Sequence, residues 1–150
     1  MTGDALFSER PGHLGELAAE AAAGGASLLV IVGGDGSVNE VANGIAGREG
    51  VTLAVIARGT GWDFIRTYGI PHSLAGAIDV ARDGVTREID LGRATYHAWG
   101  GGEASSYFAN VASAGMSGAI AQRANQTTKA SSRWPMVVVS GCPPPGSDVK

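Results

Sequence analysis

Residues 28–40 read LLVIVGGDGSVNE, and this stretch decides the fold. The five large apolar residues at 28–32 predict a strand that is buried on both faces, as in a parallel sheet. Gly33 and Gly34 allow backbone conformations that a Cβ would forbid, and they allow a ligand to come close. Ser37 is expected to cap the next helix, with Glu40 at the spacing of a capping box. A strand, a glycine turn and a helix N-terminus together favour a bound phosphate, because backbone N–H groups and the helix dipole point toward it.

The composition predicts a soluble, cytoplasmic chain with one domain, or with one domain and a fragment of another. The chain has 150 residues, of which 44% are hydrophobic, so it can form a real core. The net charge of -3 provides no basic surface for nucleic acid. One cysteine, Cys142, excludes an internal disulfide and a cysteine-based zinc site. No apolar run reaches the about 20 residues needed to cross a bilayer, and the N-terminus does not resemble a secretory signal.

The first half of the sequence predicts two successive β-loop-α units. The expected elements are a helix near residues 11–23, a strand at 28–32, a helix at about 38–45, a strand at 51–56, a short helix at 62–68 and a helix from Ser73 to about Gly84. Both glycine-containing loops follow the C-terminal ends of parallel strands. Ligands bind at that edge in open α/β sheets, so the two loops are expected to form one site.

The pattern changes after residue 84. Residues 85–91 alternate between apolar and polar, and three glycines at 100–102 lead to an apolar stretch at 107–111, which predicts an antiparallel hairpin. A further helix is expected at 118–125. Residues 131–150 are expected to be irregular, apart from a stub of strand at 137–139.

The individual residues of the two loops also have purely structural interpretations. GGDG is neither a Walker A loop nor a Rossmann GxGxxG, and Asp35 could simply cap a tight turn. Ser37 and Glu40 could form only a capping box, and Asp63 could cap the helix that follows it. Asn39 and Asn43 could be exposed polar residues of a helix, with Asn39 the better functional candidate. Aromatic residues Trp62, Phe64 and Tyr68 are expected to pack, and the three histidines lack the spacing of metal ligands.

Three segments together resemble the catalytic domain of the diacylglycerol kinase family. They are GGDGSVNEVANG at 33–44, ARGTGWDF at 57–64 and GIP at 69–71. The resemblance is strongest to the soluble bacterial lipid kinases, with sphingosine and ceramide kinases as relatives and NAD kinase as a distant one. Residues 8–13 resemble the hydroxyl-containing segment before the first helix of the family, and residues 89–92 and 108–115 resemble the entry into its second domain. The likeness covers about residues 8 to 129 in order.

This resemblance implies an ATP-dependent transfer of phosphate to a lipid hydroxyl. It implies an α/β fold, with a parallel-sheet nucleotide-binding domain at 1–84 that lacks the first strand of the family, the opening elements of a mostly antiparallel β-sandwich domain for lipid binding at 85–130 and an irregular tail at 131–150. By matching position, the implied ATP-binding residues are Ser8, Gly33, Gly34, Asp35, Gly36, Ser37, Val38, Asn39, Glu40, Gly59, Thr60 and Gly61. Asp35 is the implied catalytic residue, and Asp63 is implied to join a magnesium site through water. The implied partners are ATP, Mg²⁺ and a lipid such as diacylglycerol, with peripheral membrane contact and a homodimer.

The sequence also departs from the family. Trp62 stands where the family has Asn, and Ser37 replaces the commoner Thr. The family chain begins with a strand and an Asn-Pro turn before the segment matched here, and its second domain carries a lipid pocket, metal ligands and a base that residues 131–150 do not match. We therefore expect a lipid kinase truncated at both ends. The alternatives are a non-catalytic nucleotide-binding fragment and another GGDG kinase such as NAD kinase; Asn39-Glu40 and Gly69-Ile70-Pro71 favour the lipid-kinase branch.

Overall fold

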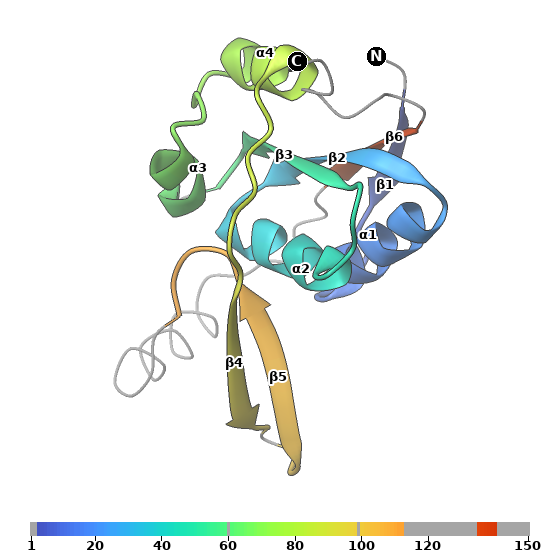
Figure 1. The fold of residues 1–150 in the computed structure, drawn as a ribbon, viewed down its shortest axis with the longest axis vertical. Helices are drawn as coiled ribbons and strands as arrows, with labels where there is room; N and C mark the ends of the chain where they lie inside the picture. The colour runs from blue at the N-terminus through green and yellow to red at the C-terminus, as the bar shows by residue number, and fades with distance from the viewer. Residues whose placement is uncertain (1–2, 60, 99, 113–134, 141–150) are drawn as a thin grey trace.

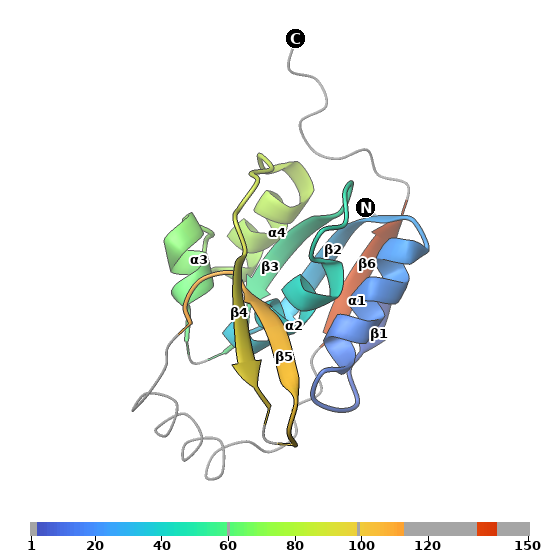
Figure 2. The same cartoon turned by 60° about the horizontal axis from the view of Figure 1, so that its bottom comes forward.

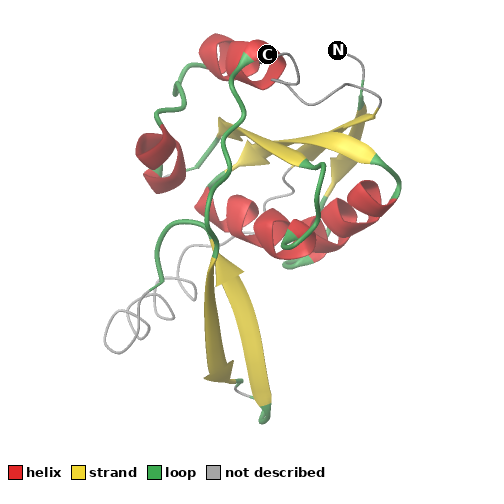
Figure 3. Cartoon of the chain, viewed as in Figure 1, coloured by secondary structure: helices red, strands yellow, loops and turns green. Residues whose placement is uncertain are grey.

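The main body of the protein has three layers, with a four-stranded sheet between two layers of helices (Figure 1). The computed structural model describes residues 3–59, 61–98, 100–112 and 135–140. Helices α1 (His13–Ala23) and α2 (Asp35–Ile45) cover one face of the sheet, and α4 (Leu74–Asp83) covers the other. A short helix, α3 (Asp63–Tyr68), follows the last strand of this sheet. The hairpin of β4 (Gly92–His97) and β5 (Glu103–Phe108) extends away from the body (Figure 3), so the predicted α/β class with an antiparallel second part is confirmed.

The sheet has the strand order β1-β6-β2-β3. Its members are β1 (Asp4–Phe7), β2 (Ala26–Gly33), β3 (Thr52–Ala57) and β6 (Pro135–Ser140). Strands β2 and β3 pair in parallel, whereas β6 lies antiparallel between β1 and β2 (Figure 2). Strands β1, β2 and β3 therefore run in one direction, and their carboxyl ends share one edge of the sheet.

The apolar run of β2 is buried on both faces, as predicted. Leu29 and Ile31 pack with residues of α1 and α2, while Leu28 and Val30 pack with residues of α4. Successive strand residues point to opposite faces, so a strand between two helical layers needs apolar residues at every position.

Strand β6 corrects the expectation of an irregular segment at 131–150. That expectation is wrong for Pro135–Ser140, and the stub expected at 137–139 is the middle of a full strand. Met136 is fully buried, and Val138 is buried with it in the core shared with α1 and α2. The strand forms because it pairs on both edges, with β1 and with β2. These partners lie more than 100 residues earlier in the chain, beyond any local pattern.

The predicted hairpin exists, but the residues predicted for its first strand were wrong. Residues 85–91 form no strand, and pairing runs instead from Gly92↔Phe108 to His97↔Glu103. The turn sets this register, because the Ala98 N–H donates to the Gly102 carbonyl at 3.0 Å and Gly101 and Gly102 adopt positive φ. The ladder ends at Phe108, the last residue of β5, which pairs with Gly92. Residues 85–91 therefore have no partner strand among the described residues. The helix expected at 118–125 lies outside the described residues.

Helices α1 and α2 cross at a contact between two glycines. A Cβ at Gly44 would overlap the Gly15 carbonyl group, and a Cβ at Gly15 would lie 2.8 Å from the Glu40 carbonyl oxygen. The two backbones can therefore approach only where both side chains are absent, and this crossing fixes α2 against α1.

Gly44→Ala is expected to lower the free energy of unfolding by about 1–3 kcal/mol, because the added methyl forces the helices apart. Gly36→Ala is the matched control on the same helix. No atom lies within 4 Å of a Cβ at Gly36, so this change is expected to stabilise the fold by up to about 1 kcal/mol. Urea unfolding of both variants measures the difference, and equal stability of Gly44→Ala and the wild type would contradict the close crossing.

Met136→Ala is expected to lower the free energy of unfolding by about 2–5 kcal/mol, because it leaves a cavity beside β2 in the centre of the sheet. Val85→Ala serves as the control, since Val85 is 87% exposed and its truncation should change stability by less than about 0.5 kcal/mol. Thermal or urea unfolding compares the two. A loss as small for Met136 as for Val85 would show that β6 does not occupy the core.

Candidate functional site

Two glycine loops meet backbone to backbone at the carboxyl edge of the sheet. The Arg58 N–H, just after β3, donates to the Gly33 carbonyl at 2.8 Å. A Cβ at Gly59 would lie 3.0 Å from the Gly34 Cα, so a side chain there would push the Gly34 backbone away. The predicted convergence of the two loops is therefore present, and the glycine at 59 permits their close approach.

Helix α2 begins earlier than predicted and without a side-chain cap. Its N-cap is Gly34 in an extended conformation, which has no side chain to cap the helix. The predicted N-cap at Ser37, and with it the capping box with Glu40, is wrong. The Ser37 N–H donates to the Gly34 carbonyl at 3.0 Å, and its hydroxyl packs on Gly33, where a Cβ would lie 2.5 Å from Oγ. The start of α2, at Asp35 and Gly36, thus has the form of a helix N-terminus that favours an anionic ligand.

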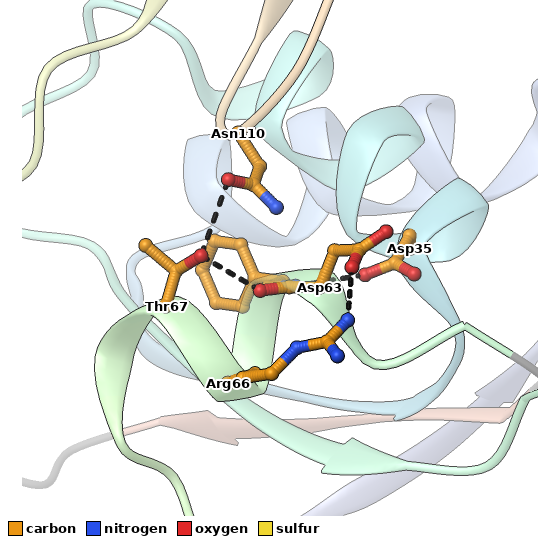
Figure 4. Close-up of polar contacts among 6 residues, drawn as sticks. Asp35, Asp63, Arg66, Thr67 and Asn110 are labelled. Atoms are coloured by element: carbon orange, nitrogen blue, oxygen red, sulfur yellow. Dashed lines mark hydrogen bonds and ion pairs between the residues drawn. The ribbon is translucent and has the colours of Figure 1, made fainter.

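The carboxylate of Asp35 caps a different helix, α3. Its Oδ1 accepts a hydrogen bond from the Phe64 N–H at 3.1 Å (Figure 4). Gly61 permits this arrangement, because a Cβ there would lie 2.6 Å from the other carboxylate oxygen of Asp35. Asp63 was one interpretation's candidate for this cap, but its carboxylate forms an ion pair with Arg66. The side chain of Asp35 therefore fixes the second loop relative to the first.

The side chain of Trp62 contacts the second loop on its exposed side. Its indole Nε1–H donates to the Gly59 carbonyl at 2.8 Å, and its ring lies 3.9 Å from that of His72, at 47°. The side chain is 45% exposed, so the expectation of packing holds better for Phe64 and Tyr68, whose rings lie 4.7 Å apart. At position 62, where the resemblance implies Asn, the indole of Trp62 thus stabilises the loop through its hydrogen bond to Gly59.

A cleft of about 370 Å³ opens beside the first turns of α2 and α3. Asp35, Asn39 and Asp63 form its polar side, and Asn110 adds an amide from the segment after β5. Ser106 and Tyr107 of β5 also line it, and the remaining residues are apolar and come from both halves of the structure: Val38, Phe64, Ala94, Phe108, Ala109, Val111 and Ala112. The cleft therefore offers hydrogen-bonding groups and apolar side chains together, and we call the part formed by Asp35, Asn39 and Asp63 its polar end.

Asn43 attaches the hairpin to α2. Its Oδ1 accepts from the Tyr107 N–H at 2.8 Å and from the Ser106 hydroxyl at 3.1 Å, and its Nδ2 donates to the Tyr107 carbonyl at 2.8 Å. The sequence suggested only an exposed polar residue here. The one available signal was its spacing of four residues from Asn39, which places both on one face of a helix.

Helix α3 contacts the next residues of the cleft lining, Ala109 and Asn110. The Tyr68 hydroxyl donates to the Ala109 carbonyl at 3.2 Å, and the Thr67 hydroxyl donates to Asn110 Oδ1 at 3.3 Å (Figure 4). Hydrogen bonds thus attach Tyr107 to α2, and Ala109 and Asn110 to α3, the two helices that carry the polar side of the cleft.

The structure brings together part of the predicted site. Gly33, Gly34, Gly59 and Gly61 form the loop junction, with Asp35 beside them and Gly36 exposed on the first turn of α2. Ser8 follows β1 at the same edge, but β6 intervenes and separates the two strands by about 10 Å.

The remaining predicted residues differ in their surroundings. Val38 is 3% exposed and belongs mainly to the core, and the Glu40 backbone lies against α1. Asp63 lies with Asp35 at the cleft. Thr60 lies outside the described residues.

The carboxylates at the cleft suit a magnesium ion that is bound through water. Asp35 and Asp63 both line the cleft, and Mg²⁺ prefers few carboxylates together with phosphate oxygens and waters. In the part of the chain that the structure describes, no three histidine, cysteine or acidic side chains are grouped to hold a metal by themselves. Within the same residues, no helix has the length and apolar character to span a membrane.

Among the described residues, the resolved pKa shifts occur in two exposed pairs, one at α1 and one at α4. A hydrogen bond from Arg10 lowers the pKa of Glu16 on α1, and the hydrogen bond and charge of Asp83 raise the pKa of Arg82 on α4. Both pairs are solvent-exposed, and exposed ion pairs contribute little to stability. They make no direct contribution to the cleft lining.

Asp35→Ala is expected to lower the free energy of unfolding by about 1 kcal/mol and to accelerate hydrogen exchange at the Phe64 amide, because α3 loses its cap. Asp35→Asn keeps an acceptor oxygen and is the matched control, with exchange at Phe64 close to that of the wild type. Residue-resolved exchange by NMR measures both. Unchanged exchange at Phe64 in Asp35→Ala would show that the cap has no role in holding α3.

Comparison with known proteins agrees with this geometry. Residues 2–94, more than half of the chain, match the diacylglycerol kinase catalytic domain. A protein named diacylglycerol kinase from Staphylococcus epidermidis is 42% identical over 89 residues, which cover 59% of this chain and 25% of that protein. A protein of the same name from Bacillus subtilis is 40% identical over 100 residues, which cover 65% of this chain and 30% of that protein. The chain thus spans between a quarter and a third of the length of these relatives, and it belongs to the diacylglycerol kinase catalytic domain family.

Proposed function

We propose that this chain binds ATP at the junction of the two glycine loops and is the nucleotide-binding part of a lipid kinase. The observation that carries the proposal is the N-terminus of α2, whose N-cap is a glycine without a capping side chain and which starts where Gly34 and Gly59 meet. Such a helix N-terminus favours a phosphate through its N–H groups and its dipole. The relatives named diacylglycerol kinase support a lipid hydroxyl as the acceptor.

The residues of this chain would act mainly by positioning. The N–H groups at the start of α2 bind the phosphates, and Ser8 and Thr60 offer hydroxyls to the nucleotide. Asp35 is held in place by the Phe64 N–H, so its carboxylate needs no rearrangement to face the reacting phosphate. Phosphoryl transfer depends on such positioning and on neutralisation of charge. Mg²⁺ held through water by Asp35 and Asp63 would supply part of that neutralisation.

The acceptor lipid would enter from the apolar part of the cleft. Phe108, Ala109 and Val111 line the same cleft as Asp35 and Asn39. A lipid hydroxyl can then lie near the phosphates while its apolar part contacts the hairpin side. Peripheral membrane contact, a homodimer and a cytoplasmic location remain predictions.

A non-catalytic nucleotide-binding role is the second candidate. The family match at residues 2–94 includes both glycine loops, so it supports nucleotide binding more directly than phosphate transfer. We expect residues 1–150 tested by themselves to bind ATP but to transfer phosphate weakly or not at all. Phosphorylation of NAD, as in the more distant kinases with a GGDG motif, is the third outcome to be tested.

The proposal predicts that residues 1–150 bind Mg-ATP in a calorimetric titration. Any transfer of labelled γ-phosphate to dioctanoylglycerol should fall at least about tenfold in Asp35→Asn, because the carboxylate charge near the phosphates is lost. Asp79→Asn is the matched control, since Asp79 is an exposed acid on α4 that pairs with Arg82. This control should bind and transfer as the wild type does.

Each outcome of these measurements separates the candidates. Absence of ATP binding would refute the proposed site. ATP binding without transfer to lipid or NAD would support the non-catalytic role. Labelling of NAD but not of dioctanoylglycerol would support the NAD-kinase alternative, and robust lipid labelling would contradict the expected weakness of this chain alone.

A further inference from the structure

The side chain of Asn43 forms the two hydrogen bonds with β5 that the backbone of a neighbouring strand would form. Its side-chain amide is bonded to both backbone groups of Tyr107, the N–H and the carbonyl, at 2.8 Å each. Strand β4 lies along the other edge of β5, so Asn43 occupies the edge that faces α2. An isolated two-stranded hairpin is marginally stable, and a side-chain amide that completes its second edge restrains it at that point.

The same face of α2 carries the polar end of the cleft. Asp35, Asn39 and Asn43 recur every four residues, and the first two line the cleft while the third holds the hairpin. With a rise of about 1.5 Å per residue, Asn43 lies about 12 Å along the helix from Asp35 and about 6 Å from Asn39. A rigid helix therefore links the expected phosphate end directly to the hairpin wall.

We propose that Asn43 is a positioning residue that sets the wall formed by residues 107–112 at a fixed distance from Asp35 and Asn39. This inference rests on the proposed function for the identity of the ligands. Asn43 touches neither end of the cleft itself, since it is absent from the cleft lining. It acts through Tyr107, and the wall carries the apolar side chains that would contact the acceptor.

The chemistry of the contact requires an amide. A carboxylate of the same size can accept from Tyr107 and Ser106 but cannot donate to the Tyr107 carbonyl, and its charge would face that oxygen. The single hydrogen bonds from Tyr68 and Thr67 hold residues 109 and 110 independently. Loss of Asn43 should thus release one end of the wall while the rest of the fold remains.

The test compares Asn43→Ala and the isosteric Asn43→Asp with Ser105→Ala in the full chain. Both Asn43 variants should accelerate hydrogen exchange at residues 107–112 at least about tenfold, with exchange at residues 38–42 of α2 changed by less than about twofold. Binding of dioctanoylglycerol should weaken at least about tenfold, whereas the Kd for Mg-ATP should change less than about twofold. Ser105 is an exposed residue of β5 that is absent from the cleft lining, so Ser105→Ala keeps both Tyr107 bonds and should resemble the wild type in all three measurements.

The exchange experiment needs no ligand, so it decides the role of Asn43 even where the proposed function fails. Unchanged exchange at residues 107–112 would overturn the inference. Equal losses of ATP and dioctanoylglycerol binding would also overturn it, because they would indicate general damage to α2. A wild type that binds neither ligand would refute the proposed function alone, with accelerated exchange in both Asn43 variants still supporting the restraint of the wall.

Discussion

The close approach of two backbones at Gly34 and Gly59 is the constraint on which the site depends. It brings the loops after β2 and β3 into contact, and Gly61 then leaves room for the Asp35 carboxylate to reach the Phe64 N–H. One carboxylate thereby fixes the start of α3 relative to the start of α2. A side chain at Gly59 would press on the backbone of Gly34, and one at Gly61 would displace the Asp35 carboxylate, so either change would alter the polar end of the cleft.

The sequence predicted the elements whose signals are local. The run at 28–32 is apolar at every position because it is buried on both faces, and the glycines after it identify the end of the strand. The helix ends at Ala23, Tyr68 and Asp83 are followed by glycines and were predicted correctly. Helix α2 was predicted to start too late because Ser37 is a good capping residue in isolation. Here the extended Gly34 already serves as the N-cap, so Ser37 turns inward against Gly33.

The contacts that assemble the cleft could not be predicted, because each joins residues far apart in the chain. Asp35 and Phe64 are separated by 29 residues, and Asn43 and Tyr107 by 64. Periodicity places Asn43 on a helix face but does not identify what lies opposite. The strand assigned to 85–91 failed for a related reason, since alternation marks a segment able to pair but the hairpin turn decides which residues do.

Strand β6 carries a consequence for the way the chain must fold. It fills the gap between β1 and β2, so the sheet cannot close until residues 135–140 have been synthesised. On a ribosome, β1, α1 and β2 would emerge long before this common neighbour, and the strand edges that β6 covers would be open in the meantime. A segment made more than 100 residues after β2 thus governs whether the first strands reach their native arrangement, and pairing over such sequence separations is slow. Open strand edges favour contact with other chains, so the interval before β6 pairs is a stage at which aggregation can begin.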